Sequence, residues 1–100
     1  MPINKDVEVT KVKLPQYQSM KIVIYGKDSC SYCKRAVELA KQLKSQGHGD
    51  YEYIDIVEAG IDAAALGELV GKPVRTVPQI FVEGEPIGGY TELVTLTSIL

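Results

Sequence analysis

Two cysteines separated by two residues are the side chains of this sequence best suited to covalent chemistry. Cys30 follows an apolar run and opens a helical pattern, and Cys33 lies one turn further along. Free backbone N–H groups and the positive end of the helix dipole stabilise a thiolate at a helix start, and Lys27 adds a positive charge nearby. We therefore expect Cys30 to attack disulfides, and Cys33, directed more towards the interior, to resolve the resulting mixed disulfide.

Two other uses of cysteine fit the sequence less well. A structural zinc site needs four ligands, and beyond the cysteine pair the chain offers only His48 and carboxylates. A cysteine hydrolase needs a histidine held against Cys30, but His48 stands between Gly47 and Gly49 and is expected in a solvated surface loop. Thiol–disulfide exchange is therefore the favoured chemistry.

The spacing of apolar residues predicts the elements that position the cysteines. A β-branched run before them is typical of a buried parallel strand, and apolar positions every three or four residues after them are typical of a helix. Later segments repeat this order and end in a hairpin and a last helix. In chain order, the predicted elements are strand 22–25, helix 31–46, strand 51–56, helix 61–70 stopped by Gly71 and Pro73, strand 79–82, turn 83–86, a strand around Ile87, and a helix with Thr91 as its N-cap.

The order β-α-β-α-β-β-α predicts an α/β fold. We expect a four-stranded mixed sheet, in which an antiparallel hairpin extends a parallel pair, with three helices available to cover both faces. Residues 1–20 precede this pattern, and their valines, spaced mostly by twos, predict either an extra N-terminal edge strand or a flexible arm with a linker. The expected organisation is an N-terminal extension over residues 1–20 and one domain over residues 21–100.

Composition excludes several classes of protein. With 100 residues, of which 45% are hydrophobic and 24% charged, the chain has the composition of one small globular domain. A formal net charge of -2 is unlike that of a nucleic-acid binder. Apolar stretches fall far short of the ~20 residues that span a bilayer, and residues 4–6 are too polar for a signal peptide. We expect a cytoplasmic monomer that binds neither nucleic acid nor membranes.

Three motifs carry a family resemblance: YGKDSCSYC at 25–33, GKPVRTVPQIFV at 71–82 and IGGYTE at 87–92. In this order they resemble the small dithiol glutaredoxins, especially the bacterial type, and the match runs from about residue 21 to 99. The resemblance implies a thioredoxin-like fold. It also implies a glutathione-dependent thiol–disulfide oxidoreductase that reduces glutathione mixed disulfides and protein disulfides through Cys30 and Cys33. The implied partners are glutathione, as co-substrate, and disulfide-containing proteins such as ribonucleotide reductase.

The resemblance further implies a groove that binds glutathione. Pro78 would be a cis-proline facing Cys30, and the backbone of Val77 would pair with the cysteinyl part of glutathione like an added strand. The glycine pair at 88–89 and the start of the last helix would receive a carboxylate, and Glu92, where bacterial relatives usually have Asp, would pair with the ammonium group. The implied groove residues are Lys27, Tyr32, Thr76, Val77, Pro78, Gly89, Tyr90, Thr91 and Glu92.

Plain structural roles stay open for several of these side chains. Glu92 could serve only as a capping acid in the first helical turn. Lys27 could be a solvated lysine, and Tyr32 could shield the disulfide. Arg75 could help to attract anions, although a solvated charge is the favoured expectation. Gln79 could be polar filler or a groove contact, and it is left out of the predicted groove.

Ser31 departs from the family pattern, which usually has proline between the first cysteine and the tyrosine. Serine restores a backbone N–H and loosens the helix start that proline would preorganise. Some relatives with this serine bridge an iron–sulfur cluster between two subunits with glutathione, so a cluster-binding dimer that uses Cys30 is one alternative function. The other is a thioredoxin-like carrier reduced by a flavoprotein reductase, against which the IGGYT segment and the absence of tryptophan count.

Overall fold

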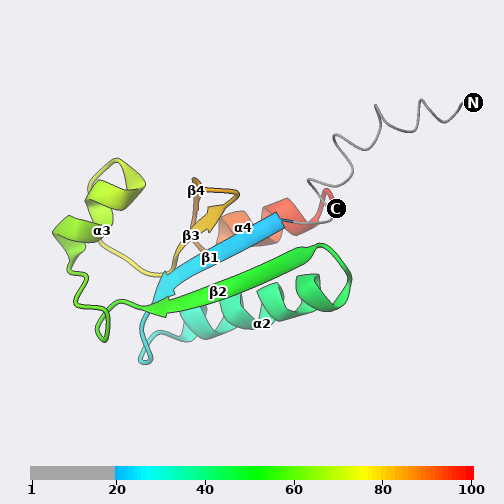
Figure 1. Cartoon of the computed structure of the whole chain (residues 1–100), viewed down its shortest axis with the longest axis horizontal. Helices are drawn as coiled ribbons and strands as arrows, with labels where there is room; N and C mark the ends of the chain where they lie inside the picture. The colour runs from blue at the N-terminus through cyan, green and yellow to red at the C-terminus, as the bar shows by residue number, and fades with distance from the viewer. Residues whose placement is uncertain (1–19) are drawn as a thin grey trace, which may run out of the picture.

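A four-stranded mixed sheet lies at the centre of the computed structural model, which describes residues 20–100 (Figure 1). The edge strand or arm expected before Met20 lies outside the described residues. The spatial order of the strands is β2-β1-β3-β4; β1 is parallel to β2 and antiparallel to β3, and β3 is antiparallel to β4. The predicted parallel pair extended by a hairpin is thus confirmed. The strands are β1 (Met20–Gly26), β2 (Gly49–Asp55), β3 (Gln79–Val82) and β4 (Glu85–Gly88).

Two of the three helices cover one face of the sheet. They are α2 (Ser31–Ser45), which contacts β1 and β2, and α4 (Tyr90–Thr97), which contacts β3 and β4. These two helices also pack against each other. The third, α3 (Ala63–Val70), lies beyond the ends of β1 and β2 in Figure 1 rather than flat on the second face. The three predicted helices are therefore present, but α3 does not cover the second face of the sheet.

The core fills the space between β1, β3 and the two packed helices. Side chains of β1 alternate across the sheet, so Ile22 and Ile24 are buried while Val23 and Tyr25 are only half-buried. The continuous apolar run had predicted a strand buried throughout, and the difference arises because one face lacks a covering helix. The buried core residues are Met20, Ile22, Ile24, Ala36, Ala40, Leu43, Ile80 and Leu93.

Local hydrogen bonds shift several element boundaries from their predicted places. Helix α3 begins at Ala63 because the Asp62 carboxylate accepts the Ala65 N–H at 2.8 Å and so caps the helix. The β3–β4 turn shrinks to Glu83 and Gly84, whose φ angles of 54° and 81° match the two-residue turns that follow strand twist. The predicted turn residues 85–86 belong to β4 instead.

His48 lies in the loop between α2 and β2, as expected, but it is half-buried rather than solvated. Its N–H donates to the Leu43 carbonyl at 2.9 Å, and its own carbonyl accepts the Met20 N–H at 2.9 Å. Within residues 20–100, its Nδ1 is buried without a hydrogen-bond partner. The residue thus joins the end of α2 to the start of β1. No helix in this part of the chain is long and apolar enough to cross a membrane.

Candidate active site at the start of helix α2

Cys30 is the N-cap of α2. Its backbone is extended, with φ -99° and ψ 114°, and its Sγ accepts a hydrogen bond from the Cys33 N–H at 3.0 Å. This N–H is one of the donors that a helix start leaves without a partner in the helix. A negative sulfur at this position gains both the hydrogen bond and the favourable end of the helix dipole. The start of α2 thus offers the Cys30 sulfur a backbone donor.

A second contact places Cys30 beside the loop before β3. Its Sγ lies 3.4 Å from the Val77 carbonyl oxygen, to which the thiol donates. The peptide bond between Val77 and Pro78 is cis, as the resemblance implies. Because a thiolate has no proton to donate, ionisation of Cys30 breaks its hydrogen bond to Val77 and frees that carbonyl for another donor.

Cys33 lies behind Cys30 and is fully buried, as expected. Burial raises the pKa of the Cys33 thiol to about 12, and Cys30 adds to the rise through a hydrogen bond and its charge. Formation of a mixed disulfide on Cys30 removes the Cys30 charge, so one of the causes that hold Cys33 protonated disappears at that step. Both cysteines are in the thiol state in this structure.

Two adjoining pockets form a groove over Cys30, and we call it the Val77 groove because Thr76 and Val77 line both parts. One part, of about 330 Å³, contains eight of the nine residues that the resemblance implied. The other, of about 450 Å³, contains Cys30 and the ninth residue, Lys27. The first part is lined by Tyr32, Thr76, Val77, Pro78, Gln79, Gly89, Tyr90, Thr91 and Glu92.

The Val77 groove also contains residues that were not predicted from the sequence, among them Arg75 and Gln79. Arg75 is exposed, as expected of a solvated charge, and it lines the same pocket as Lys27 and Cys30. Gln79 lines the other part, and its side-chain amide donates to the Thr76 carbonyl at 2.9 Å. The signal for both was their position on either side of the Thr-Val-Pro segment. Neighbours of a segment that lines a groove are close enough to line the same groove.

Tyr32 forms one rim of the groove and is 54% exposed. The centroid of the Tyr32 ring is 5.9 Å from that of the Tyr90 ring. The guanidinium carbon of Arg35 lies over the Tyr32 ring, 5.1 Å from its centroid. A cation over an aromatic face is attracted by the ring quadrupole, so Arg35 helps to hold the exposed ring in place.

Glu92 caps helix α4 rather than projecting freely into the groove. Its Oε1 accepts the Gly89 N–H at 2.8 Å, which makes Gly89 the N-cap, and the expected N-cap role of Thr91 is therefore wrong. A Cβ at Gly88, where φ is 114°, would lie 2.8 Å from the Glu92 carboxyl carbon. The structure thus shows the capping hydrogen bond, and Glu92 also lines the Val77 groove.

Substitution of Glu92 separates its hydrogen bond from its charge. We expect Glu92→Ala to lower the free energy of unfolding by about 1 kcal/mol, because the Gly89 N–H loses its acceptor. Glu92→Gln should retain most of that stability, since its amide oxygen can accept the same bond. Urea denaturation of both variants measures the difference. An equal loss in the two would mean that charge at the helix start, and not the hydrogen bond, stabilises this turn.

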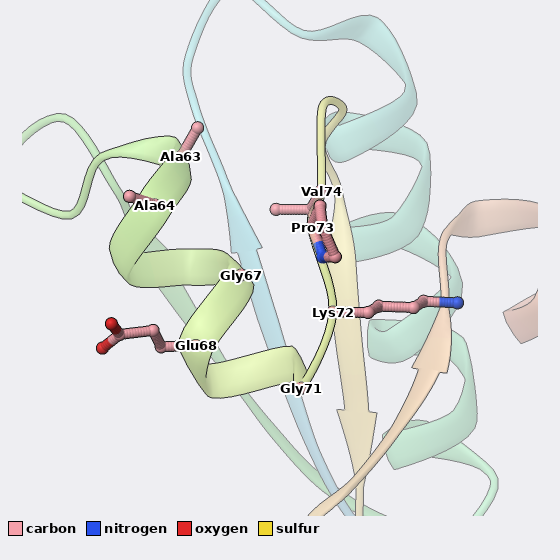
Figure 2. A pocket seen from close by; sticks show the side chains of 8 residues that line it. All are labelled: Ala63, Ala64, Gly67, Glu68, Gly71, Lys72, Pro73 and Val74. Atoms are coloured by element: carbon pink, nitrogen blue, oxygen red, sulfur yellow. The ribbon is translucent and has the colours of Figure 1, made fainter.

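A larger hollow, of about 670 Å³, lies between α3 and the segment 72–74, and neither cysteine lines it. Figure 2 shows the small side chains Ala63 and Ala64 on the helix and Lys72 pointing away from it. A Cβ at Gly67 would lie 3.1 Å from the Lys72 carbonyl oxygen, so glycine lets the segment pass close to the helix. This hollow offers packing surface rather than reactive groups.

Comparisons with known proteins agree with this site. A family model described as glutaredoxin matches residues 22–87. The chain is 49% identical to a glutaredoxin of Haemophilus influenzae, covering 77% of this chain and 90% of the relative, and 47% identical to glutaredoxin 1 of Escherichia coli, covering 73% and 87%. Among solved structures, reduced Escherichia coli glutaredoxin superposes with a TM-score of 0.72 at 42% identity over 79% of this chain and 94% of that one. A buckwheat glutaredoxin–glutathione complex superposes with a TM-score of 0.63 at 26% identity over 98% and 87%. The thioredoxin-like fold is confirmed, and the chain belongs to the glutaredoxin family of thiol–disulfide oxidoreductases.

Proposed function

We propose that this glutaredoxin reduces glutathione mixed disulfides and protein disulfides, with glutathione as the electron donor. The observation that carries the proposal is the position of Cys30, at the start of α2 and on the floor of the Val77 groove. A related buckwheat glutaredoxin has been solved in complex with glutathione. Glutathione is a short, extended peptide with a carboxylate at each end, which suits an elongated groove with cations at one end.

Reduction of a glutathione mixed disulfide needs only Cys30. The Cys30 thiolate attacks the glutathionyl sulfur, a disulfide forms between them, and the substrate leaves as a thiolate that takes up a proton. A second glutathione thiolate then attacks the glutathionyl sulfur on Cys30. Glutathione disulfide leaves and the Cys30 thiolate is restored, so each turnover consumes one free glutathione, and the other half of the glutathione disulfide comes from the substrate.

Reduction of a protein disulfide uses both cysteines. Cys30 attacks one sulfur of the target and forms a mixed disulfide with it, and the other target sulfur leaves as a thiol. Cys33 loses its proton and attacks the Cys30 sulfur, which releases the reduced target and leaves a Cys30–Cys33 disulfide. Two glutathione molecules reduce this disulfide. Ribonucleotide reductase is a proposed target of this class.

The Val77 groove offers a distinct contact to each part of glutathione. Val77 lies next to the reacting sulfur, where its backbone N–H and carbonyl would pair with the cysteinyl residue like an added strand. Lys27 and Arg75, in the same pocket as Cys30, would attract the glycyl carboxylate. The γ-glutamyl carboxylate would lie at the start of α4, beside Gly89 and Thr91. Glu92 would contact the ammonium group while it caps the helix.

The proposal is tested by turnover of a small glutathione mixed disulfide with glutathione as the only reductant. We expect rapid formation of glutathione disulfide by the natural protein and none above background with a Cys30→Ser control. No turnover by the folded natural protein would contradict the proposal. Efficient reduction by thioredoxin reductase would then favour a thioredoxin-like carrier, and visible absorbance after anaerobic purification would favour a cluster-bridged dimer.

Removal of the two cations should weaken substrate binding without slowing the bound reaction. We expect Lys27→Gln and Arg75→Gln each to raise KM for the mixed disulfide about threefold, and the double variant about tenfold, with kcat little changed, because exposed ionic contacts are individually weak. Lys72→Gln is the matched control, since Lys72 carries the same charge but lines the hollow beside α3. A comparable rise in KM for Lys72→Gln would show that net charge, rather than the placement of the two cations, governs binding.

A further inference from the structure

Cys33 is packed against a wall formed by the end of β1 and by an aromatic ring of β2. A Cβ at Gly26 would lie 2.7 Å from the Cys33 Sγ and 3.1 Å from Cε1 of Tyr53. The first distance is far below van der Waals contact, so no larger residue fits at Gly26 unless the sulfur moves. The sulfur and the tyrosine ring therefore pack against the same point of the strand.

A second groove approaches Cys33 from the β2 side of helix α2. It measures about 370 Å³ and shares only Lys27 with the Val77 groove. Cys33, Tyr51 and Tyr53 line it, together with the exposed side of α2. Although Cys33 borders this groove, none of its surface is exposed. Tyr53, which lines this groove, is also the side chain whose ring lies beside the sulfur at Gly26.

We propose that Gly26 and Tyr53 are positioning residues that confine Cys33 to reaction with Cys30. Gly26 leaves the recess that the sulfur occupies, and the Tyr53 ring closes the β2-side groove against water and dissolved disulfides. The inference rests on the proposed function, because confinement matters only if Cys33 must be kept for the second exchange. A Cys33 open to the β2 side would itself form mixed disulfides, and the sulfur needed to release a protein target would be lost.

The electrostatics of Tyr53 agree with this placement. Burial raises the pKa of Tyr53 to about 12, and the charge of Cys33 is the next cause. The phenol therefore stays neutral wherever thiol exchange takes place, and the wall remains an uncharged ring beside the sulfur. A neutral aromatic ring excludes water from the sulfur better than a phenolate would.

Alkylation in a Cys30→Ser background tests the wall, because Cys33 is then the sole cysteine. Iodoacetamide reacts as the Cys33 thiolate displaces iodide, and its rate is measured across a range of pH. We expect Tyr53→Phe, which keeps the ring, to match the parent within about twofold. Tyr53→Leu and Tyr53→Ala should react about tenfold faster or more, and their pH midpoint should move downward.

Tyr51→Ala is the matched control, since Tyr51 lines the same groove, whereas the atoms nearest to a Cβ at Gly26 belong to Cys33 and Tyr53. It should leave the alkylation rate within about twofold of the parent, which separates opening of the wall from general loss of stability. Equal rates in the parent and in folded Tyr53→Leu would overturn the proposal, as would an equal acceleration by Tyr51→Ala. If Tyr53→Ala does not fold, Tyr53→Leu decides the result.

Gly26→Ala tests the recess in the protein with both cysteines. We expect the rate of protein-disulfide reduction to fall about tenfold relative to the rate of mixed-disulfide turnover. Gly67→Ala is the control, because its Cβ would crowd the Lys72 backbone and neither cysteine. An unchanged ratio of the two rates in Gly26→Ala would overturn the role of the recess. The alkylation assay needs no glutathione, so a failure of the proposed function would appear separately, as absent turnover in the natural protein.

Discussion

Replacement of Cys30 with serine should abolish thiol–disulfide exchange, with a loss of about a thousandfold or more for every substrate. A serine hydroxyl is not ionised near neutral pH and does not attack disulfides, whereas the Cys30 sulfur receives the Cys33 N–H and the helix dipole. Rates are measured with a glutathione mixed disulfide and with a protein disulfide. Appreciable turnover of either substrate by Cys30→Ser would contradict the assignment of the nucleophile.

Cys33→Ser should preserve the turnover of glutathione mixed disulfides but block the reduction of protein disulfides. We expect turnover of the mixed disulfide to stay within about threefold of the natural rate, because each step occurs at Cys30. Reduction of the protein disulfide should stop at a mixed disulfide between Cys30 and the target, detectable by mass spectrometry. Circular dichroism checks that the variant is folded, since Cys33→Ser places a hydroxyl at a fully buried position. Equal loss of both reactions by a folded Cys33→Ser would refute the division of roles.

Gly49→Ala should be among the most destabilising single substitutions in this protein. At Gly49 the φ angle is 138°, and an added Cβ would lie 1.9 Å from the Met20 carbonyl oxygen. Met20 and Gly49 are the first register partners of the parallel pair β1–β2, so the clash pushes the two strands apart where they begin. We expect a loss of at least about 3 kcal/mol in the free energy of unfolding, and a Tm lower by roughly 12 °C or more.

Gly47→Ala is a close control for Gly49→Ala. Gly47 also has a positive φ, 85°, but no atom lies within 4 Å of the position that a Cβ would take. It should therefore cost only the backbone strain, about 1 kcal/mol. Thermal unfolding followed by circular dichroism compares the two variants. If both lose the same stability, backbone strain alone accounts for the glycine at position 49.

Much of the fold was predictable because it depends on short-range patterns. The β-branched run at 22–25 and the apolar spacing in 31–46 correctly placed a strand and a helix on either side of the cysteines. Gly71 was correctly expected to end a helix, and it does so with a φ of 94°. Boundaries set by a side chain were less accurate, because the capping bonds of Asp62 and Glu92 compete with equally suitable neighbours.

The candidate site was predictable where a sequence motif marks residues that have a defined chemical role. A cysteine at a helix start is recognisable from the order of elements alone, and the family resemblance pointed to eight residues that the structure brings into one pocket. Arg75 is exposed, as expected, but a charged residue in a loop gives no local sign of the pocket that it lines. The burial of His48 was misjudged for the same reason, since two flanking glycines indicate a turn and say nothing about the packing around it.

By itself, the sequence determined the elements, their order and the asymmetry between Cys30 and Cys33, because helix capping and periodicity act over a few neighbouring residues. Tertiary structure alone decided what surrounds each sulfur. Val77 reaches Cys30 across 47 positions of the chain, and Tyr53 closes on Cys33 from another strand. Such contacts depend on how strands and helices pack, and the space at Gly26 is so small that an added Cβ would lie 2.7 Å from the Cys33 Sγ. Local sequence patterns carry no measure of that space.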